Sequence, residues 1–209
     1  MPLHAEIEKA LKEIKQFEEK EKKLDSAAGH PLGSNKEEDF LRRYTFYKKV
    51  YTLLNAIEKE INICKRLFSL FPKDQLHYRP KEGMRSTLEL LQYLTVIGSV
   101  MPAFWIQPAE PFNEFFAHRT KSAMEVNEDN FVEAMDKQLT EIHSLFSGIT
   151  DEDLLNKEIS FPWGSTAALG DAILGTSVKF ITAYKMQLYL YLKMSTDQTL
   201  GTADAWALT

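Results

Sequence analysis

Apolar residues recur at three- and four-residue spacing along most of the chain, which is the period of a helix with one buried face. This pattern predicts four long core helices over residues 36–71, 86–101, 129–147 and 167–193. A further amphipathic helix is predicted near residues 3–26. The sequence has no long alternating strand pattern and no internal repeat. We therefore expect an all-α fold, a four-helix bundle with an extra N-terminal helix.

Breaker residues divide the chain into a short and a long part. Glycine, proline, serine and asparagine gather in residues 29–35, as in a linker. Residues 1–28 then form the N-terminal amphipathic helix, and residues 36–209 form the bundle domain. Lysines and glutamates are interleaved around the apolar stripe of the N-terminal helix. This mixture favours a helix lying on the domain or on a partner chain over a membrane-surface helix.

Capping signals set the ends of the core helices. Ser86 and Glu89 have the spacing of a capping box at a helix start. Pro72 ends the first core helix, and Gly148 ends the third. Pro102 is expected to kink or end the second.

The connections between the core helices are long. Residues 72–85 read as a loop, residues 112–125 as a short helix, and residues 159–164 as an extended or irregular segment. The tail, residues 200–209, is expected to be irregular.

Composition and charge narrow the possible partners. The 209 residues are 44% hydrophobic and 26% charged, which is ordinary for a globular protein of one domain with an appendage. The 25 Lys and Arg residues against 30 Asp and Glu give a net charge of −5, so no nucleic-acid partner is expected. The first residues do not have the pattern of a signal peptide, and Gly98 and Pro102 interrupt the longest weakly polar stretch. We expect a cytoplasmic protein that does not insert into a membrane.

Several kinds of chemistry are unsupported by the sequence. Cys64 is the single cysteine, so an intramolecular disulfide is excluded, and its place on an apolar stripe favours a small buried hydrophobe. The five histidines form no His-x-x-x-His or Glu-x-x-His pair, so we expect no bundle-core metal and no cofactor. His143 lies at the edge of an apolar stripe, and we expect a structural histidine whose ring nitrogens have hydrogen-bond partners.

Two stretches resemble the DinB/YfiT-like proteins. In residues 76–91 an Arg-Pro pair and a glycine precede the Ser86 helix start, and residues 168–188 resemble the last helix of that family with its closing Gln187. The resemblance covers residues 36–209 in order and spacing. It implies an up-down-down-up four-helix bundle that is usually a homodimer.

The resemblance also implies a site that this sequence has changed. Many members hold a divalent metal, often nickel or zinc, on three histidines, and some are thiol-dependent transferases. The matching positions here are Tyr93, Phe180 and Tyr184. Phenylalanine has no donor atom, and neutral tyrosine is a poor ligand beside imidazole. The position before Ser86, often tryptophan in the family, is Arg85.

The replaced residues define a candidate site. Phe180 and Tyr184 share a helical face, and Tyr93 is predicted to face them across the bundle. Gln187, one turn beyond Tyr184, is a candidate partner for a buried hydroxyl. The cluster has two interpretations, a plain aromatic core or a pocket for a small organic ligand. Trp163 accordingly is either a hydrophobic lid over the core or a wall of that pocket.

Three functions follow from these interpretations. The first is a metal-free DinB-like protein that binds a small ligand or acts as an interaction module. The alternative is a thiol-dependent transferase with a rebuilt active site. The third is a structural dimerisation protein whose partner binds the N-terminal helix.

Overall fold

The computed structural model describes Lys12, Gln16 and residues 35–207, without the side chains of residues 35–47 and Asp151. Apart from Lys12 and Gln16, the predicted N-terminal helix and linker lie outside these residues, so the domain boundaries at 1–28 and 29–35 stay predictions. The long helices are α2 (Asn35–Ser69), α3 (Thr87–Ile97), α6 (Phe131–Ser147) and α9 (Lys179–Ser195).

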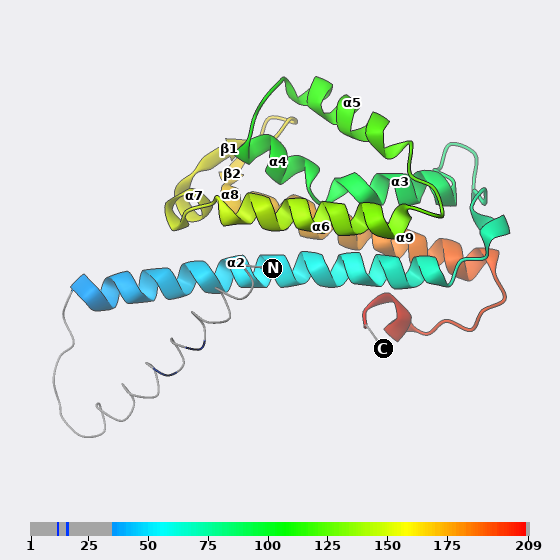
Figure 1. Cartoon of the computed structure of the whole chain (residues 1–209), viewed down its shortest axis with the longest axis horizontal. Helices are drawn as coiled ribbons and strands as arrows, with labels where there is room; N and C mark the ends of the chain where they lie inside the picture. The colour runs from blue at the N-terminus through cyan, green and yellow to red at the C-terminus, as the bar shows by residue number, and fades with distance from the viewer. Residues whose placement is uncertain (1–11, 13–15, 17–34, 208–209) are drawn as a thin grey trace.

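These four helices lie side by side around one core (Figure 1). Helices α2 and α9 run in one direction and α3 and α6 in the other, which is the up-down-down-up order. Helix α2 packs against α9 and α6, and α3 packs against the same two helices. The strands in the described part of the chain are β1 (Glu158–Ser160) and β2 (Thr166–Ala168), a short antiparallel pair. The prediction of an all-α fold is confirmed.

The core is built from the apolar stripes of all four helices. The core includes Ile57, Ile61, Leu90, Leu94, Phe131, Ile142, Ile181 and Leu188. Burial of each such side chain stabilises the fold by about 1.5–3 kcal/mol relative to leaving it exposed. Cys64 is buried in the same core, and burial raises the pKa of its thiol. Its reading as a small hydrophobe is confirmed.

Side-chain caps begin two of the helices. The Glu89 backbone N–H donates to Ser86 Oγ at 3.2 Å, and the Ser86 N–H donates to the Glu89 carboxylate at 2.6 Å. Thr150 and Asp153 form the same reciprocal pair at the start of α7 (Asp151–Asn156). Both arrangements satisfy N–H groups that the helix leaves open. Gly148 is the C-cap of α6, as expected from the sequence.

The second predicted helix is broken before Pro102. Helix α3 ends at Ile97, and α4 (Val100–Ile106) continues after a short break. Pro102 lies in the first turn of α4, where a helix leaves the backbone N–H groups without partners, so its missing N–H does not weaken α4. A continuous helix would need that N–H to donate to the Gly98 carbonyl. Gln138 of α6 inserts at the break, because its amide oxygen accepts from the Gly98 N–H at 2.8 Å and its amide nitrogen donates to the Leu94 carbonyl at 2.9 Å. A continuous helix would join these two backbone groups directly.

Gly98 is also required by packing at this break. A Cβ atom on Gly98 would lie 2.4 Å from Ile181 Cδ1 and 2.8 Å from Gln138 Oε1. The close approach of α3 to α9 and α6 therefore depends on the missing side chain.

The fourth predicted helix is present, but it contains a π-helical turn. Residues 166–168 belong to β2, and α8 (Leu169–Ile173) leads into a π-helical turn, Leu174–Val178, before α9. The Thr176 hydroxyl donates to the Ala172 carbonyl at 2.7 Å inside this turn. A hydroxyl bond to the carbonyl four residues earlier often bends a helix. A π turn is a single wider turn within an α-helix.

The connecting segments cover two sides of the bundle. Helix α5 (Phe112–Ala123) crosses outside α3 and α4 (Figure 1), close to its predicted range. The loop after α2 contains a short 3₁₀ helix, Lys73–Gln75. The tail is more ordered than expected, because a 3₁₀ helix, Thr202–Ala205, packs against α2 and α9.

Helices α3 and α4 are also the most apolar part of the described chain. The stretch Thr87–Ile106 is the one described segment long and apolar enough to cross a membrane. Most of it is buried inside the protein, which is the behaviour of a core helix.

Candidate ligand-binding site

The two tyrosines at the predicted site meet across the bundle. Tyr93 of α3 and Tyr184 of α9 have ring centroids 4.8 Å apart and ring planes at 77°, an edge-to-face contact. Both side chains are half-buried, as is Phe180 one turn before Tyr184. The helix registers predicted from the sequence therefore place this aromatic pair correctly.

Arg85 adds a positive charge to the tyrosine pair. Its guanidinium carbon lies 4.0 Å from the Tyr93 ring centroid and 5.6 Å from that of Tyr184, within cation–π range. Arg85 comes immediately before the Ser86 cap, so the start of α3 fixes its backbone. No carboxylate pairs with Arg85 among the side chains that the structure describes.

The environment keeps Tyr93 in its neutral form. Burial of the phenol first, and the neighbouring Tyr184 second, raise the pKa of Tyr93 to about 12, although Arg85 acts in the opposite direction. Tyr93 is thus a neutral hydroxyl that can donate or accept a hydrogen bond across the physiological pH range.

Gln187 has a different partner from the one expected. Its amide donates to the Tyr191 hydroxyl at 2.6 Å, and that hydroxyl donates to the Arg85 carbonyl oxygen at 3.0 Å. Tyr191 is almost fully buried. Gln187 thus bonds a buried hydroxyl, but it is that of Tyr191 and not that of Tyr93 or Tyr184, for which it was the candidate partner. Instead, the chain from Gln187 through Tyr191 holds the backbone of Arg85 in place.

Trp163 lies apart from the tyrosines. It is 60% exposed in the turn between β1 and β2, where it stacks on Phe161 at a centroid distance of 4.7 Å. Phe161 in turn contacts Trp105 of α4 edge-on. Gly164 supplies the positive φ of 93° that the turn needs. The hairpin lies beside α4, at the end of the bundle away from the start of α3 (Figure 1), so Trp163 does not close a pocket over Tyr93.

A groove opens beside Tyr93 between α3 and α5. Its volume is about 420 Å³. The groove is lined by Arg85, Glu89, Gln92, Tyr93, Val96, Phe116, Ala117, Thr120, Lys121, Ala123 and Met124. The Gln92 amide donates to the carbonyls of Met124 and Val126 at 3.1 and 2.9 Å, which ties the end of α5 to α3. The α5 wall of the groove was not predicted from the sequence, although the apolar residues of the predicted helix over 112–125 could have indicated it.

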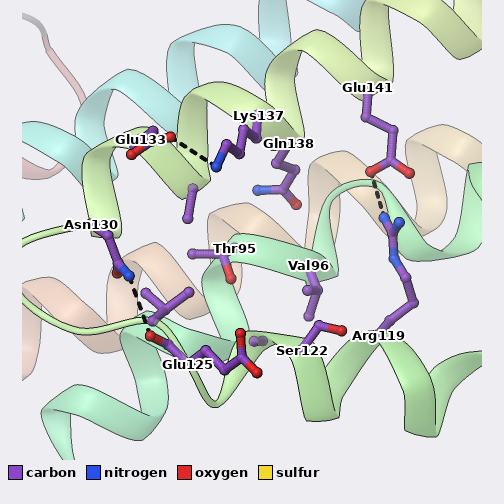
Figure 2. A pocket seen from close by; sticks show the side chains of 13 residues that line it. Thr95, Val96, Arg119, Ser122, Glu125, Asn130, Glu133, Lys137, Gln138 and Glu141 are labelled. Atoms are coloured by element: carbon purple, nitrogen blue, oxygen red, sulfur yellow. Dashed lines mark hydrogen bonds and ion pairs between the residues drawn. The ribbon is translucent and has the colours of Figure 1, made fainter.

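A larger groove of about 680 Å³ lies on the other side of α5, against α3 and α6 (Figure 2). Each of its two cations already has a carboxylate partner. Arg119 pairs with Glu141 and also donates to Ser99 Oγ at 2.7 Å, and Lys137 pairs with Glu133 at 2.8 Å. Because its cations are matched by the protein itself, we assign the candidate site to the smaller groove.

The residues at the candidate site do not fit a metal ion. The described part of the chain contains no group of three His, Cys, Asp or Glu side chains placed to hold one. Phe180 has no donor atom, and the raised pKa of Tyr93 disfavours a phenolate ligand. The Arg85 guanidinium over the Tyr93 ring would repel a cation as well. The side chains gathered here are therefore not a metal-binding set.

Comparison with solved structures shows the fold. No protein-family profile and no curated protein matches the sequence. A protein assigned to the DinB family from Exiguobacterium sibiricum aligns over 73% of this chain and 95% of its own, with a TM-score of 0.55 and 19% identity. A DinB-like protein from Bacillus subtilis aligns over 72% of this chain and 96% of its own, with a TM-score of 0.54 and 17% identity. The chain has the DinB-like fold.

Proposed function

We propose that this DinB-like protein is a metal-free module that binds a small organic ligand in the groove between α3 and α5. The observation that supports the proposal is the open groove beside Tyr93, which is one of the three positions where the resemblance puts the family's metal ligands. Its volume of about 420 Å³ falls within the range of ligand pockets, roughly 300–1,000 Å³.

The lining of the groove is suited to such a ligand. Tyr93, Phe116 and Met124 give it apolar walls, while Arg85 and the Tyr93 hydroxyl offer polar contacts. Ligand sites generally combine a mostly apolar wall with a few polar groups that orient the ligand. A plain aromatic core would not leave this much open volume beside Tyr93.

The groove supports a thiol-dependent transferase less well. No histidine lines it, so the groove lacks the side chain most often used as a general base. Cys64 lies buried in the core and is not a nucleophile for that reaction. Binding without turnover is therefore the function that the arrangement favours.

The remaining proposals concern the setting of the protein. We propose a soluble cytoplasmic homodimer that has neither a nucleic-acid nor a membrane partner. The net charge of −5 and the burial of the most apolar helical stretch support this view. Sedimentation equilibrium tests the dimer, and a monomer at all concentrations would contradict it.

Methionine methyl NMR tests ligand binding at the groove. Met124 lines the groove and is 71% exposed, so its ¹³C-methyl signal reports on occupancy. Met194, 56% exposed on α9 and not part of the groove, serves as the control. In a screen of small aromatic compounds, binders should move the Met124 signal and leave Met194 unchanged. A screen in which no compound moves Met124 would contradict the proposal.

A further inference from the structure

We infer that the groove selects organic anions, with the Arg85 guanidinium as the anchor for a carboxylate. This inference rests on the proposed function and names the chemical class of its ligand. It predicts that an acid with a flat apolar body binds more tightly than its neutral or cationic analogues.

Arg85 is exceptional among the arginines whose side chains the structure describes. The structure describes four arginine side chains, and three of them have a carboxylate partner. The pairs are Arg66 with Asp204, Arg79 with Glu89, and Arg119 with Glu141. Arg85 instead rests on two aromatic rings at the edge of the groove. Its charge is the one arginine charge in the described part that the protein leaves without a carboxylate.

The geometry leaves the donor edge of Arg85 available. The guanidinium carbon lies over the Tyr93 ring, 4.0 Å from the ring centroid. Stacking of this kind restrains the side chain without using its N–H groups. The Tyr191 hydroxyl fixes the carbonyl of the same residue. A restrained guanidinium with uncommitted N–H groups suits the two oxygens of a carboxylate, which Arg recognises through paired hydrogen bonds.

The charge of the groove supports an anionic ligand. Lys121 of α5 is a second cation on its lining, and Glu89 is the carboxylate that could oppose them. Glu89 is already engaged, because it accepts from the Ser86 N–H and pairs with Arg79 at 2.9 Å. These two interactions, the backbone bond first, lower the pKa of Glu89. The groove therefore carries net positive charge in a protein whose overall charge is −5.

The walls define the body of the ligand. Phe116 and Met124 from the α5 side face Val96 and Tyr93 from α3. Aromatic and thioether side chains are favourable neighbours for a flat ring. A volume of about 420 Å³ accommodates an acid with one or two rings.

Three probes with the same ring system test the inference: 2-naphthoate, 2-naphthamide and 2-naphthylmethylammonium. Affinity is measured by calorimetry, and occupancy of the groove by the Met124 methyl signal. We expect 2-naphthoate to bind roughly tenfold or more tightly than the amide, as for a charge-assisted hydrogen bond. The ammonium probe should bind most weakly.

Substitutions then assign the preference to Arg85. Arg85→Gln should remove most of the advantage of 2-naphthoate and change binding of the amide less than about twofold. Arg85→Lys keeps the charge but loses the planar fork, so it should retain part of the advantage. Glu89→Gln keeps a residue able to complete the capping box while removing a negative charge, and should strengthen naphthoate binding. Lys73→Gln, an exposed cation that does not line the groove, is the matched control.

The outcomes separate the two proposals. If all three probes move Met124 with equal affinities, or if Arg85→Gln leaves the preference for naphthoate intact, the inference is overturned and ligand binding in the groove stands. If no probe moves Met124, both the inference and the proposed function are overturned for ligands of this size.

Discussion

Arg85 and Lys185 each lie against an aromatic ring, and the two regions differ in what surrounds the cation. At the α3–α9 contact, the Arg85 guanidinium lies over Tyr93 and opens on a groove. Between α2 and α9, the Lys185 ammonium lies 4.2 Å from the Trp206 ring centroid and is fully buried. The difference separates a cation that stabilises the fold from one that can meet a ligand.

The charge of the buried Lys185 is paired with a carboxylate, and its side chain is enclosed by the protein. Its Nζ atom lies 2.6 Å from Oε2 of Glu60, and Trp206 covers it from the tail. The tail is held in place by Arg66, which pairs with Asp204 at 2.7 Å and donates to the Ala207 carbonyl at 3.2 Å. Because a buried charge without a partner is very costly, this pair ties α2, α9 and the tail together.

The half-buried Arg85 lacks both features. It has no carboxylate partner among the described side chains, and the lining of the groove leaves it in reach of solvent. A half-buried cation needs no carboxylate partner, because water still solvates its charge. The same exposure would let a carboxylate replace that water. The following tests are ordered from the largest expected effect to the smallest.

Removing one member of the buried pair should have the largest effect. Lys185→Ala leaves Glu60 without its partner, and the free energy of unfolding should fall by about 3–5 kcal/mol. Urea denaturation measures the loss. The double variant Glu60→Leu with Lys185→Met should recover most of it, since no charge is then left unpaired. Arg85→Ala is the counterpart at the open site and should cost no more than about 1 kcal/mol. Equal losses at the two sites would break the comparison.

Loss of the ring over Lys185 should have an intermediate effect. Trp206→Ala removes the cation–π contact and loosens the tail, and we expect a loss of about 1–2 kcal/mol in the free energy of unfolding. Amide hydrogen exchange of residues 201–207 should accelerate in the same variant. Trp163→Ala, which removes a more exposed tryptophan from the hairpin, is the control and should cost less. An unchanged exchange rate in the tail would show that Trp206 does not hold it.

The raised pKa of Tyr93 should make the stability of the protein depend on pH above about 10. The folded state holds the Tyr93 proton more tightly than the unfolded chain, whose tyrosine pKa is about 10. Stability from this group is therefore complete below pH 10 and declines as the pH rises toward 12, the folded value. Tyr184→Phe should lower the pKa of Tyr93 but leave it above the usual value, because burial is the larger cause. Ultraviolet titration of the phenolate measures both values, and a pKa of Tyr93 near 10 would contradict the account.

Metal ions should have the smallest effect. Added nickel or zinc, or a chelator, should leave the melting temperature and the Met124 methyl signal unchanged, since the residues at the candidate site do not form a donor set. Elemental analysis of the purified protein is the accompanying measurement. One tightly held metal ion per chain at Tyr93 and Tyr184 would contradict this expectation.

Periodicity and caps predicted the helices well because both act locally. The Ser86 cap and the Gly148 end both follow from spacing within one helix. The breaks did not follow in the same way. The end of α3 depends on Gln138, which lies 40 residues from Gly98, and the π turn before α9 depends on how Thr176 bonds within a packed helix.

The candidate site was predicted in part for the same reason. Tyr93 and Tyr184 were found from matching positions, but Arg85 was noted only as a departure from the family. Its role depends on α5, which crosses α3 and supplies Lys121 and Phe116 to the groove. The pairing of Lys185 with Glu60 was also missed, because nothing in a helical pattern marks which lysine is buried.

The most direct test of the central claim follows the Arg85 side chain itself. Its Nε–H signal, assigned by comparison with Arg85→Lys, is recorded by NMR while 2-naphthoate is added, and then while 2-naphthamide is added. The account predicts that the carboxylate shifts this signal progressively to saturation, together with the Met124 methyl, and that the amide shifts the methyl without a comparable change at Nε–H. A naphthoate titration that moves Met124 but leaves the Arg85 signal in place would contradict it.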